Sequence, residues 1–157
     1  MTKITPPNND YPCNNNNIDQ LRAENIKFRQ LVDSLPVEIY WKDKNGVWEG
    51  ANIRCLTHLK EMGIINKGRI SEVLDKTDYQ LFNQQTADYR KNDIEVMNEK
   101  KEISFEENIL LDSGEQITLL SIKTPLYDIN GEVSGVLGNT INITHIKKIE
   151  MELKQAK

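Results

Sequence analysis

Residues 123–144 read KTPLYDINGEVSGVLGNTINIT, and this stretch decides the expected fold. The tetrapeptide Asp-Ile-Asn-Gly at 128–131 has the composition of a tight turn, because Asp and Asn bond to nearby backbone groups and Gly adopts a positive φ without steric cost. Residues 117–127 are apolar with polar interruptions, and residues 133–141 resume an extended pattern after the turn. The stretch therefore predicts a β-hairpin whose second strand runs straight into a helix.

Two glycines lie in the second strand of this hairpin. Gly135 and Gly138 leave the strand without side chains at two positions. Such glycines either permit a twist or bulge or leave room for another group to approach the sheet, and the sequence leaves both interpretations open.

The same stretch resembles the C-terminal end of a PAS domain. The matching residues are Lys123, Pro125, Leu126, Asp128, Gly131, Gly135, Gly138, Ile143 and Thr144. In the family, an Asp-Ile-Thr triplet closes the last strand and leads into a signalling helix, and Asn142 replaces its acidic residue here. By this resemblance we expect Asn142, Ile143 and Thr144 to relay the signal, through a junction that has lost a charge-assisted hydrogen bond.

Two segments further upstream also resemble the family. Residues 39–52, IYWKDKNGVWEGAN, are similar to the family's first hairpin, with Asn-Gly as the turn and Asn52 placed to cap the next helix. Residues 76–79, KTDY, match another family segment, and Thr77 with Gln80 forms a capping box there. The resemblance covers about residues 26–157.

Composition narrows the class of protein. The chain has 157 residues with a net charge of −4, which favours one domain and gives no reason to expect nucleic acid binding. It contains no apolar run long enough to span a membrane and no secretory signal, and Cys13 and Cys55 form no disulfide framework. We therefore expect a cytoplasmic location.

The N-terminal region has two parts. Residues 1–17 hold three prolines and six asparagines, so we expect a disordered tail. Residues 18–35 predict a helix that Pro36 ends, with an a/d seam of heptad spacing. The seam consists of Ile18, Leu21, Asn25, Phe28, Val32 and Leu35. Such a seam either packs on its own domain or forms a parallel homodimer in which Asn25 fixes the register.

The expected fold class is α+β. The strands are predicted at 37–43, 47–51, 103–111, 115–127 and 133–141, and the helices at 52–62, 71–82 (two short turns), 84–101 and 144–157. The resemblance implies a PAS fold, a five-stranded antiparallel sheet in the order 2-1-5-4-3 with helices on one face. Residues 36–144 form the domain, 145–157 begin a coiled-coil-like signalling helix, and both flanking helices are expected to leave from one edge of the sheet.

The resemblance also implies a ligand cavity. Its expected lining residues are Trp48, Tyr79, Tyr89, Asp93, Met97, Ser121, Lys123 and Asn139. Polar members would orient a small-molecule ligand and aromatic members would bury it, or the aromatics simply fill a small core. We expect no haem, because the helix at 84–101 lacks histidine, and no flavin photochemistry, because Ile53 stands where the reactive cysteine would be required.

Catalytic and metal sites are not expected. Cys55 and His58 lie three residues apart but lack further ligands, so no metal is expected. Asp78 is interpreted as a helix-start charge, and of Glu106 and Glu107 one is expected to point outward and the other to flank the rim of the sheet. The sequence contains no phosphate loop and no nucleophile–base pair.

The expected function is that of a sensory module, most often the input domain of a two-component sensor histidine kinase with a C-terminal kinase or other output domain. Two alternatives remain open at this stage. One is a ligand-free dimerising scaffold, and the other is the input domain of a cyclic-dinucleotide enzyme or a transcription regulator.

Overall fold

The structure, a computed structural model, describes residues 2–7, 18–82 and 86–157. Its helices are α1 (Ile18–Ser34), α2 (Ile53–Glu61), the 3-10 turn η1 (Ile70–Glu72), α3 (Asp78–Phe82), α4 (Ala87–Glu99) and α5 (Thr144–Gln155). Its strands are β1 (Glu38–Asp43), β2 (Trp48–Ala51), β3 (Ile103–Leu110), β4 (Gln116–Tyr127) and β5 (Val133–Asn142).

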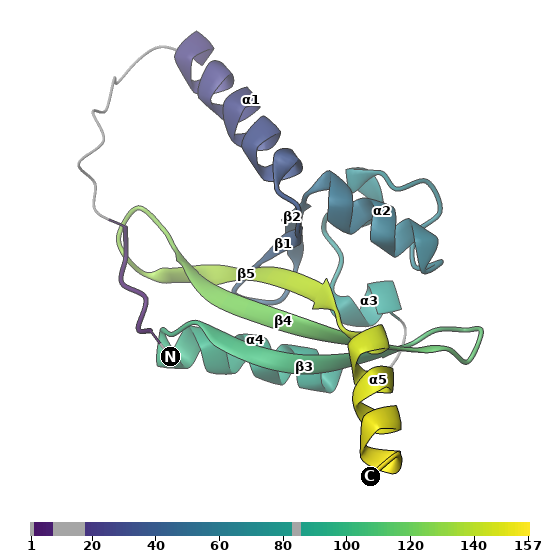
Figure 1. Ribbon diagram of the computed structural model, residues 1–157. Coiled ribbons are helices and arrows are strands. Elements are labelled where there is room, and N and C mark those ends of the chain that lie inside the picture. The colour runs from purple at the N-terminus through teal and green to yellow at the C-terminus, as the bar shows by residue number, and fades with distance from the viewer. Residues whose placement is uncertain (1, 8–17, 83–85) are drawn as a thin grey trace.

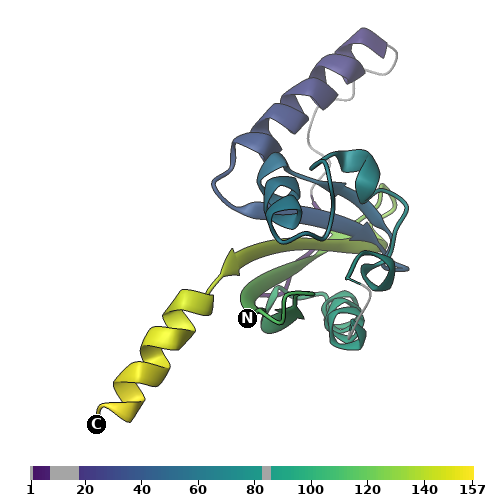
Figure 2. The same cartoon turned by 90° about the vertical axis from the view of Figure 1, so that its right-hand side faces the viewer.

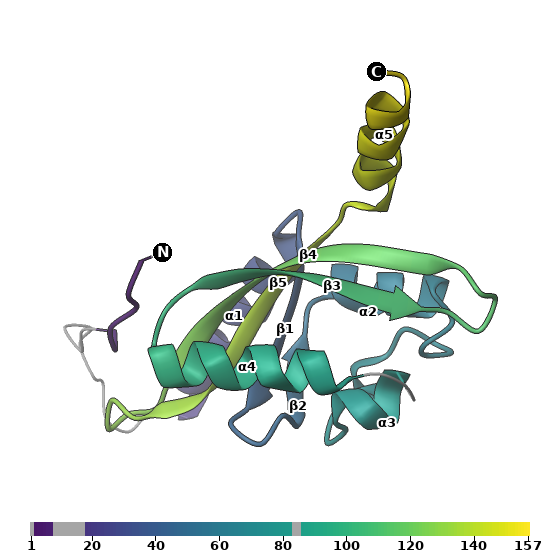
Figure 3. The same ribbon diagram turned by 90° about the horizontal axis from the view of Figure 1, so that it is seen from below.

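The five strands form one antiparallel sheet in the order β2-β1-β5-β4-β3, which confirms the predicted topology and the α+β class. The first and last strands, β1 and β5, therefore lie side by side at its centre (Figure 1). Helices α2, α3 and α4 cover one face of the sheet (Figure 3). Because side chains alternate along a strand, every second residue points into the layer between the sheet and these helices.

The β4–β5 hairpin and the β1–β2 hairpin close by the same local chemistry. Asp128 Oδ1 accepts hydrogen bonds from the backbone N–H groups of Asn130 and Glu132, at 2.8 and 3.0 Å. Asp43 makes the same pair of bonds in the first hairpin, to Asn45 and Val47. Each turn then requires a glycine at positive φ, as the sequence pattern predicts.

Asn52 ties three elements together. Its Oδ1 accepts from Cys55 N and from Ile39 N, each at 3.0 Å, which caps α2 and fixes it to β1. Its Nδ2 donates to the carbonyls of Val32 and Val37, at the end of α1 and just after it. Asn52 is fully buried, so its four bonds satisfy an amide that would otherwise be costly to desolvate.

The flanking helices pack little against the domain. Neither α1 nor α5 has a buried residue. The contact of α1 with the outer face of the sheet includes an edge-to-face pair of Phe28 and Trp41, with ring centroids 6.2 Å apart. Glu38, at the start of β1, pairs with Thr140 near the end of β5, so both helices leave from the same end of the central strands. They then extend in opposite directions (Figure 2).

Residues 2–7 lie against the sheet, which differs from the disorder expected over 1–17. Ile4 N donates to the carbonyl of Lys100 at 2.9 Å, and Tyr127 Oη donates to the carbonyl of Ile4 at 2.7 Å. Backbone groups make these bonds whatever the side-chain composition, so the polar character of the segment did not reveal them. The rest of the expected tail, residues 8–17, lies outside the described residues.

Candidate functional site

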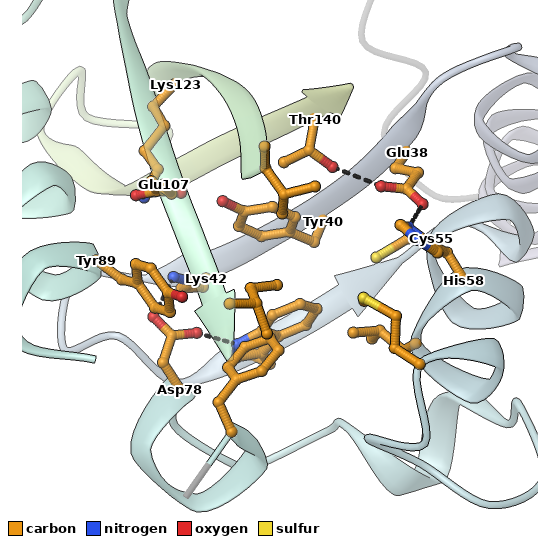
Figure 4. A pocket seen from close by; sticks show the side chains of 16 residues that line it. Glu38, Tyr40, Lys42, Cys55, His58, Asp78, Tyr89, Glu107, Lys123 and Thr140 are labelled. Carbon is orange, nitrogen blue, oxygen red and sulfur yellow. Dashed lines mark hydrogen bonds and ion pairs between the residues drawn. The ribbon is translucent and has the colours of Figure 1, made fainter. Parts of the chain in front are cut away.

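A small cavity lies between the sheet and the covering helices. Its volume is about 50 Å³, and its lining comes from all five strands and from α2, α3 and α4. Polar residues gather at its two ends, with Tyr40 and apolar side chains between them (Figure 4). Such a space holds one or two waters, whereas pockets for drug-sized ligands measure roughly 300–1,000 Å³. An occupant must therefore be compact, or the wall must move.

One end of the cavity is formed by a linear series of five buried charges, here called the charge chain. Its members, in order of contact, are Asp78, Lys42, Asp93, Lys123 and Glu107. The successive nitrogen–oxygen distances are 2.6, 2.8, 2.7 and 2.8 Å. Three carboxylates and two ammonium groups give the charge chain a formal charge of −1.

Neighbouring polar groups complete the charge chain. Trp48 Nε1 donates to Asp78 Oδ1 at 2.8 Å, and Asn92 Nδ2 donates to Glu107 Oε2 at 2.9 Å. The ring of Tyr40 lies 5.1 Å from the ammonium of Lys42 and stacks on Trp48, with centroids 4.8 Å apart. These contacts hold each charged group in a single position at the cavity wall.

The three central members of the charge chain, Lys42, Asp93 and Lys123, keep their charges despite their burial. Burial disfavours the ammonium of Lys42, but the charges of Asp78 and Asp93 outweigh this effect and raise its pKa. The pKa of Lys123 is raised in the same way, by Glu107 and Asp93 against desolvation. The pKa of Asp93 is lowered, because the two lysines outweigh the desolvation of its carboxylate.

The other end of the cavity is a smaller set, here called the mouth group: Glu38, His58 and Thr140. Thr140 Oγ1 donates to Glu38 Oε2 at 2.8 Å, and Glu38 Oε1 contacts His58 Nδ1. The hydrogen bond to Glu38 raises the pKa of His58, and this effect exceeds the lowering by desolvation. The His58 side chain is 20% exposed, so the mouth group reaches the surface, in contrast to Lys123 at 0%.

Gly138 and Gly135 both lie where a residue of β1 approaches β5 closely. A Cβ built on Gly138 would lie 2.1 Å from Tyr40 Cζ, so the missing side chain makes room for the tyrosine ring. A Cβ on Gly135 would lie 2.0 Å from the carbonyl oxygen of Lys42. Both glycines thus permit close approach by β1, and the approach comes from this chain's own residues.

Four of the eight expected site residues lie at the cavity or in the charge chain. Trp48, Tyr89 and Lys123 line the cavity, and Asp93 joins the two lysines. Burial raises the pKa of Tyr89 to about 12, so its hydroxyl stays protonated as it donates to the carbonyl of Asn108. Their role toward a ligand stays a prediction.

The other four expected residues do not line the cavity. Tyr79 is 68% exposed, because it follows the inward-pointing Asp78 by one helical position. Asn139 lies on the opposite face of β5 from Thr140, as strand alternation requires. Met97 lies two turns along α4 from Tyr89 and packs in a separate apolar cluster. Ser121 is buried, and its hydroxyl has no partner within the described chain.

Sequence reasoning missed six residues of the charge chain and the mouth group: Glu38, Lys42, His58, Asp78, Glu107 and Thr140. Asp78 does begin α3 but is also a buried ion-pair partner, and Glu107 is 6% exposed rather than at the rim of the sheet. A signal was present, since Lys42 has the strand parity of Tyr40, and Glu107 that of Ile109. Within the described residues, no three metal-ligating side chains are grouped for a metal ion.

The junction between β5 and α5 is held by hydrogen bonds. Asn142 Oδ1 accepts from the N–H and the hydroxyl of Thr144, at 3.0 and 2.7 Å. Thr118 of β4 donates its N–H to Thr144 Oγ1 at 2.9 Å and accepts from Ile143 N at 2.9 Å. Asn142 thus makes the local bonds expected for the start of α5, and β4 anchors the same turn.

The structure thus combines a five-stranded antiparallel sheet, helices that cover one of its faces, and a small enclosed cavity between them with polar groups at its two ends. The chain matches the family model described as PAS fold over residues 32–147, and it belongs to the PAS family. This segment is therefore a PAS sensory domain and not itself a catalytic domain. No curated protein matches the sequence significantly.

Three solved structures illustrate the similarity. The Vibrio cholerae VqmA dimer, a LuxR-type receptor, is 21% identical with a TM-score of 0.63 over 77% of this chain and 52% of that chain. The PAS domain of an HTR-like protein from Haloarcula marismortui is 18% identical, with a TM-score of 0.58 over 80% and 96%. The PAS domain of Bordetella pertussis BvgS is 21% identical, with a TM-score of 0.54 over 87% and 98%.

This chain therefore spans about half the length of the VqmA chain that it matches. Identities at this level show a shared fold alone. In the part of the chain that the structure describes, no helix has the length and apolar character needed to cross a bilayer.

Proposed function

We propose that this domain senses a compact small molecule in its cavity and passes the change to α5, and through α5 to a C-terminal output domain. The observation that carries the proposal is the position of β5. Thr140 lines the cavity, and Asn142 of the same strand makes the hydrogen bonds that begin α5. A shift of β5 at the cavity thus reaches the first turn of α5 along two residues of extended backbone.

The cavity chemistry favours an amphipathic ligand. The middle of the wall is apolar, with side chains that include Leu59, Met62 and Leu119. The far end offers the ammonium groups and carboxylates of the charge chain, which donate and accept hydrogen bonds. A molecule with an apolar body and one hydrogen-bonding end fits this arrangement. The small volume argues against both haem and flavin, the absence of histidine in α4 argues against haem, and Ile53 in place of a reactive cysteine argues against flavin photochemistry.

We also propose that the domain works as a homodimer through α1. Its apolar residues face solvent, with Ile18, Leu21 and Phe28 between 51% and 65% exposed. Isolated helices are marginal in water, so an exposed amphipathic helix of this kind gains stability from a second copy. Replacing Phe28 and Val32 by Asp should dissociate the dimer in sedimentation experiments at micromolar concentration, while the same substitutions at Lys27 and Arg29 should do less.

For the output we propose a two-component histidine kinase in the cytoplasm. The heptad-like spacing of Ile146, Ile149 and Leu153 in α5 supports a coiled-coil connection to such a domain. The second candidate is a transcription regulator, which the similarity to the LuxR-type receptor VqmA favours. The sequence that follows Lys157 in the parent protein distinguishes them: a histidine-bearing dimerisation helix indicates the kinase and a helix-turn-helix the regulator.

The sensing role is tested by ligand screening. Small amphipathic molecules are added to ¹⁵N-labelled protein, and amide shifts are followed in the wild type and in Leu119→Phe, which fills the cavity. Binding in the wild type that Leu119→Phe abolishes supports the proposal. If no molecule binds, and the protein purified from cells carries none, a ligand-free dimerising scaffold replaces it.

A further inference from the structure

Two hollows of the molecule meet at the mouth group. The enclosed cavity lies on one side, and on the other is an open groove of about 540 Å³. Glu38, His58 and Thr140 line both, whereas the remaining groove residues come from the end of α1, the outer side of α2 and the end of β5. The three side chains of the mouth group therefore form a partition between the cavity and the surface.

This partition is more weakly held than the opposite end of the cavity. At the opposite end, five charges are linked by four ion pairs, and each side chain is at most 10% exposed. The mouth group has one ion pair and one hydrogen bond, and Glu38 and His58 are 14% and 20% exposed. A partly exposed ion pair contributes little stability, so it opens at small cost. The backbone on either side stays fixed by the sheet and by the Asn52 bonds.

We infer that Glu38, His58 and Thr140 are the entrance of the cavity, through which a compact amphipathic ligand passes from the groove when the Glu38–His58 contact opens. The inference rests on the proposed sensing function for the ligand, but the entrance is a property of the structure alone. Thr140 and Asn142 both line the groove. Passage through the entrance therefore disturbs β5 close to Asn142, which accepts hydrogen bonds from Thr144 at the start of α5.

The groove provides an alternative partner for His58. Glu61 lies three residues further along α2 and lines the groove, so rotation of the imidazole out of the mouth brings it near a second carboxylate. The other charged groups that face this space are Arg54 on α2 and Asp33 on α1. Asp33 is engaged at the start of α2, where its Oδ1 accepts from Ile53 N at 2.8 Å.

The charges also set the direction of a pH effect. His58 and Glu38 attract each other most when the imidazole is protonated, so the entrance is held closed on the acid side. The hydrogen bond with Glu38 raises the pKa of His58, and the attraction between the two side chains weakens as pH rises through that pKa. At the far end the pKa values of Lys42 and Lys123 are raised and that of Asp93 is lowered, so these three central charges are kept in this range.

Cys55 is an internal reporter of access. Its buried thiol lines the cavity, next to the entrance. The test uses Cys13→Ser protein, so that Cys55 is the single thiol, and methyl methanethiosulfonate as the probe. The Cys55 thiolate attacks the methylthio sulfur, a disulfide forms and methanesulfinate leaves, and mass spectrometry follows the gain of one methylthio group.

The comparison is between variants at one pH. His58→Ala removes the main part of the partition and should speed modification by about tenfold or more, since access no longer depends on local opening. Glu38→Gln, which is isosteric, should also speed the modification of Cys55. This variant serves as a second test if His58→Ala does not fold. Thr57→Ala changes the groove but not the partition and should react like the parent. The ratio of the parent rate to the His58→Ala rate should rise toward one as pH increases through the raised pKa of His58.

Equal modification rates in the parent, His58→Ala and Glu38→Gln would contradict the inference that the mouth group is the entrance of the cavity. So would rates that follow global unfolding, recognised by a urea dependence as steep as that of the unfolding transition. The proposed sensing function fails separately: the entrance variants then react faster as expected, while no small molecule binds.

Discussion

The two polar ends of the cavity differ in how deeply their charged groups are buried. The charge chain buries two ammonium groups and three carboxylates almost completely, and the shifted pKa values of Lys42, Asp93 and Lys123 keep these three groups ionised. The mouth group places one titratable imidazole at the edge of solvent. The first arrangement fixes the shape of the site, because any missing partner leaves a buried charge unpaired. The second allows the wall to open, because little energy holds it closed.

The largest expected effect comes from breaking the charge chain at its centre. Asp93→Ala leaves Lys42 and Lys123 each with one fewer carboxylate in a buried setting, and it should lower the free energy of unfolding by about 3–5 kcal/mol. Urea denaturation measures the change. Asp88→Ala, at an exposed position in the first turn of α4, should cost less than about 1 kcal/mol. Equal losses in the two variants would show that the charge chain does not hold the site.

A smaller effect, which depends on pH, is expected at the mouth group. The pKa of His58 is raised from 6.5 in the folded state, so its stabilising contribution is fully present below about pH 6.5 and is lost as pH rises through the folded value. The loss of stability in His58→Gln should be below about 1 kcal/mol in acid and should vanish in alkali. Urea titrations at several pH values measure it, and a pH-independent difference would contradict the assigned ion pair.

The same comparison extends to the β5–α5 junction. Asn142→Ala removes the two hydrogen bonds that Asn142 Oδ1 accepts from Thr144 and should cost about 1 kcal/mol, without unfolding the sheet. Asn142→Asp keeps the geometry and adds a negative charge at the N-terminus of α5, so it should stabilise that turn by about 0.3–1 kcal/mol. Hydrogen exchange in residues 144–147 reports the change. Unfolding of the whole domain by Asn142→Ala, or no response to Asn142→Asp, would contradict this role.

How well the sequence predicts a part of the structure depends on how far apart in the sequence its interacting residues lie. The hairpins depend on Asp43 and Asp128 bonding within four residues, so the sequence reveals them directly. The strand order was obtained from the family resemblance. The charge chain joins Lys42 to Asp78 and Asp93 across 36 and 51 residues, and no local pattern records such pairings.

The misplaced residues show the same limit at shorter range. Tyr79 and Asn139 were each expected in the cavity, yet each is one position away from a residue that does line it, Asp78 or Thr140. A shift of one residue turns a side chain by about 100° on a helix and to the opposite face of a strand. The alternation of side chains along β1 and β3 predicts that Lys42 and Glu107 face inward, because Lys42 lies two positions from the buried Tyr40 and Glu107 two positions from the buried Ile109.

The central claim is that the state of the cavity reaches α5 through β5. Xenon, which occupies small apolar cavities, serves as a minimal occupant, and ¹⁵N–¹H spectra of the full chain are recorded with and without it. Our account predicts amide shifts around the cavity that continue through Thr140 to Asn142, Ile143 and Thr144. Shifts confined to the cavity wall, with the β5–α5 junction unchanged, would contradict it.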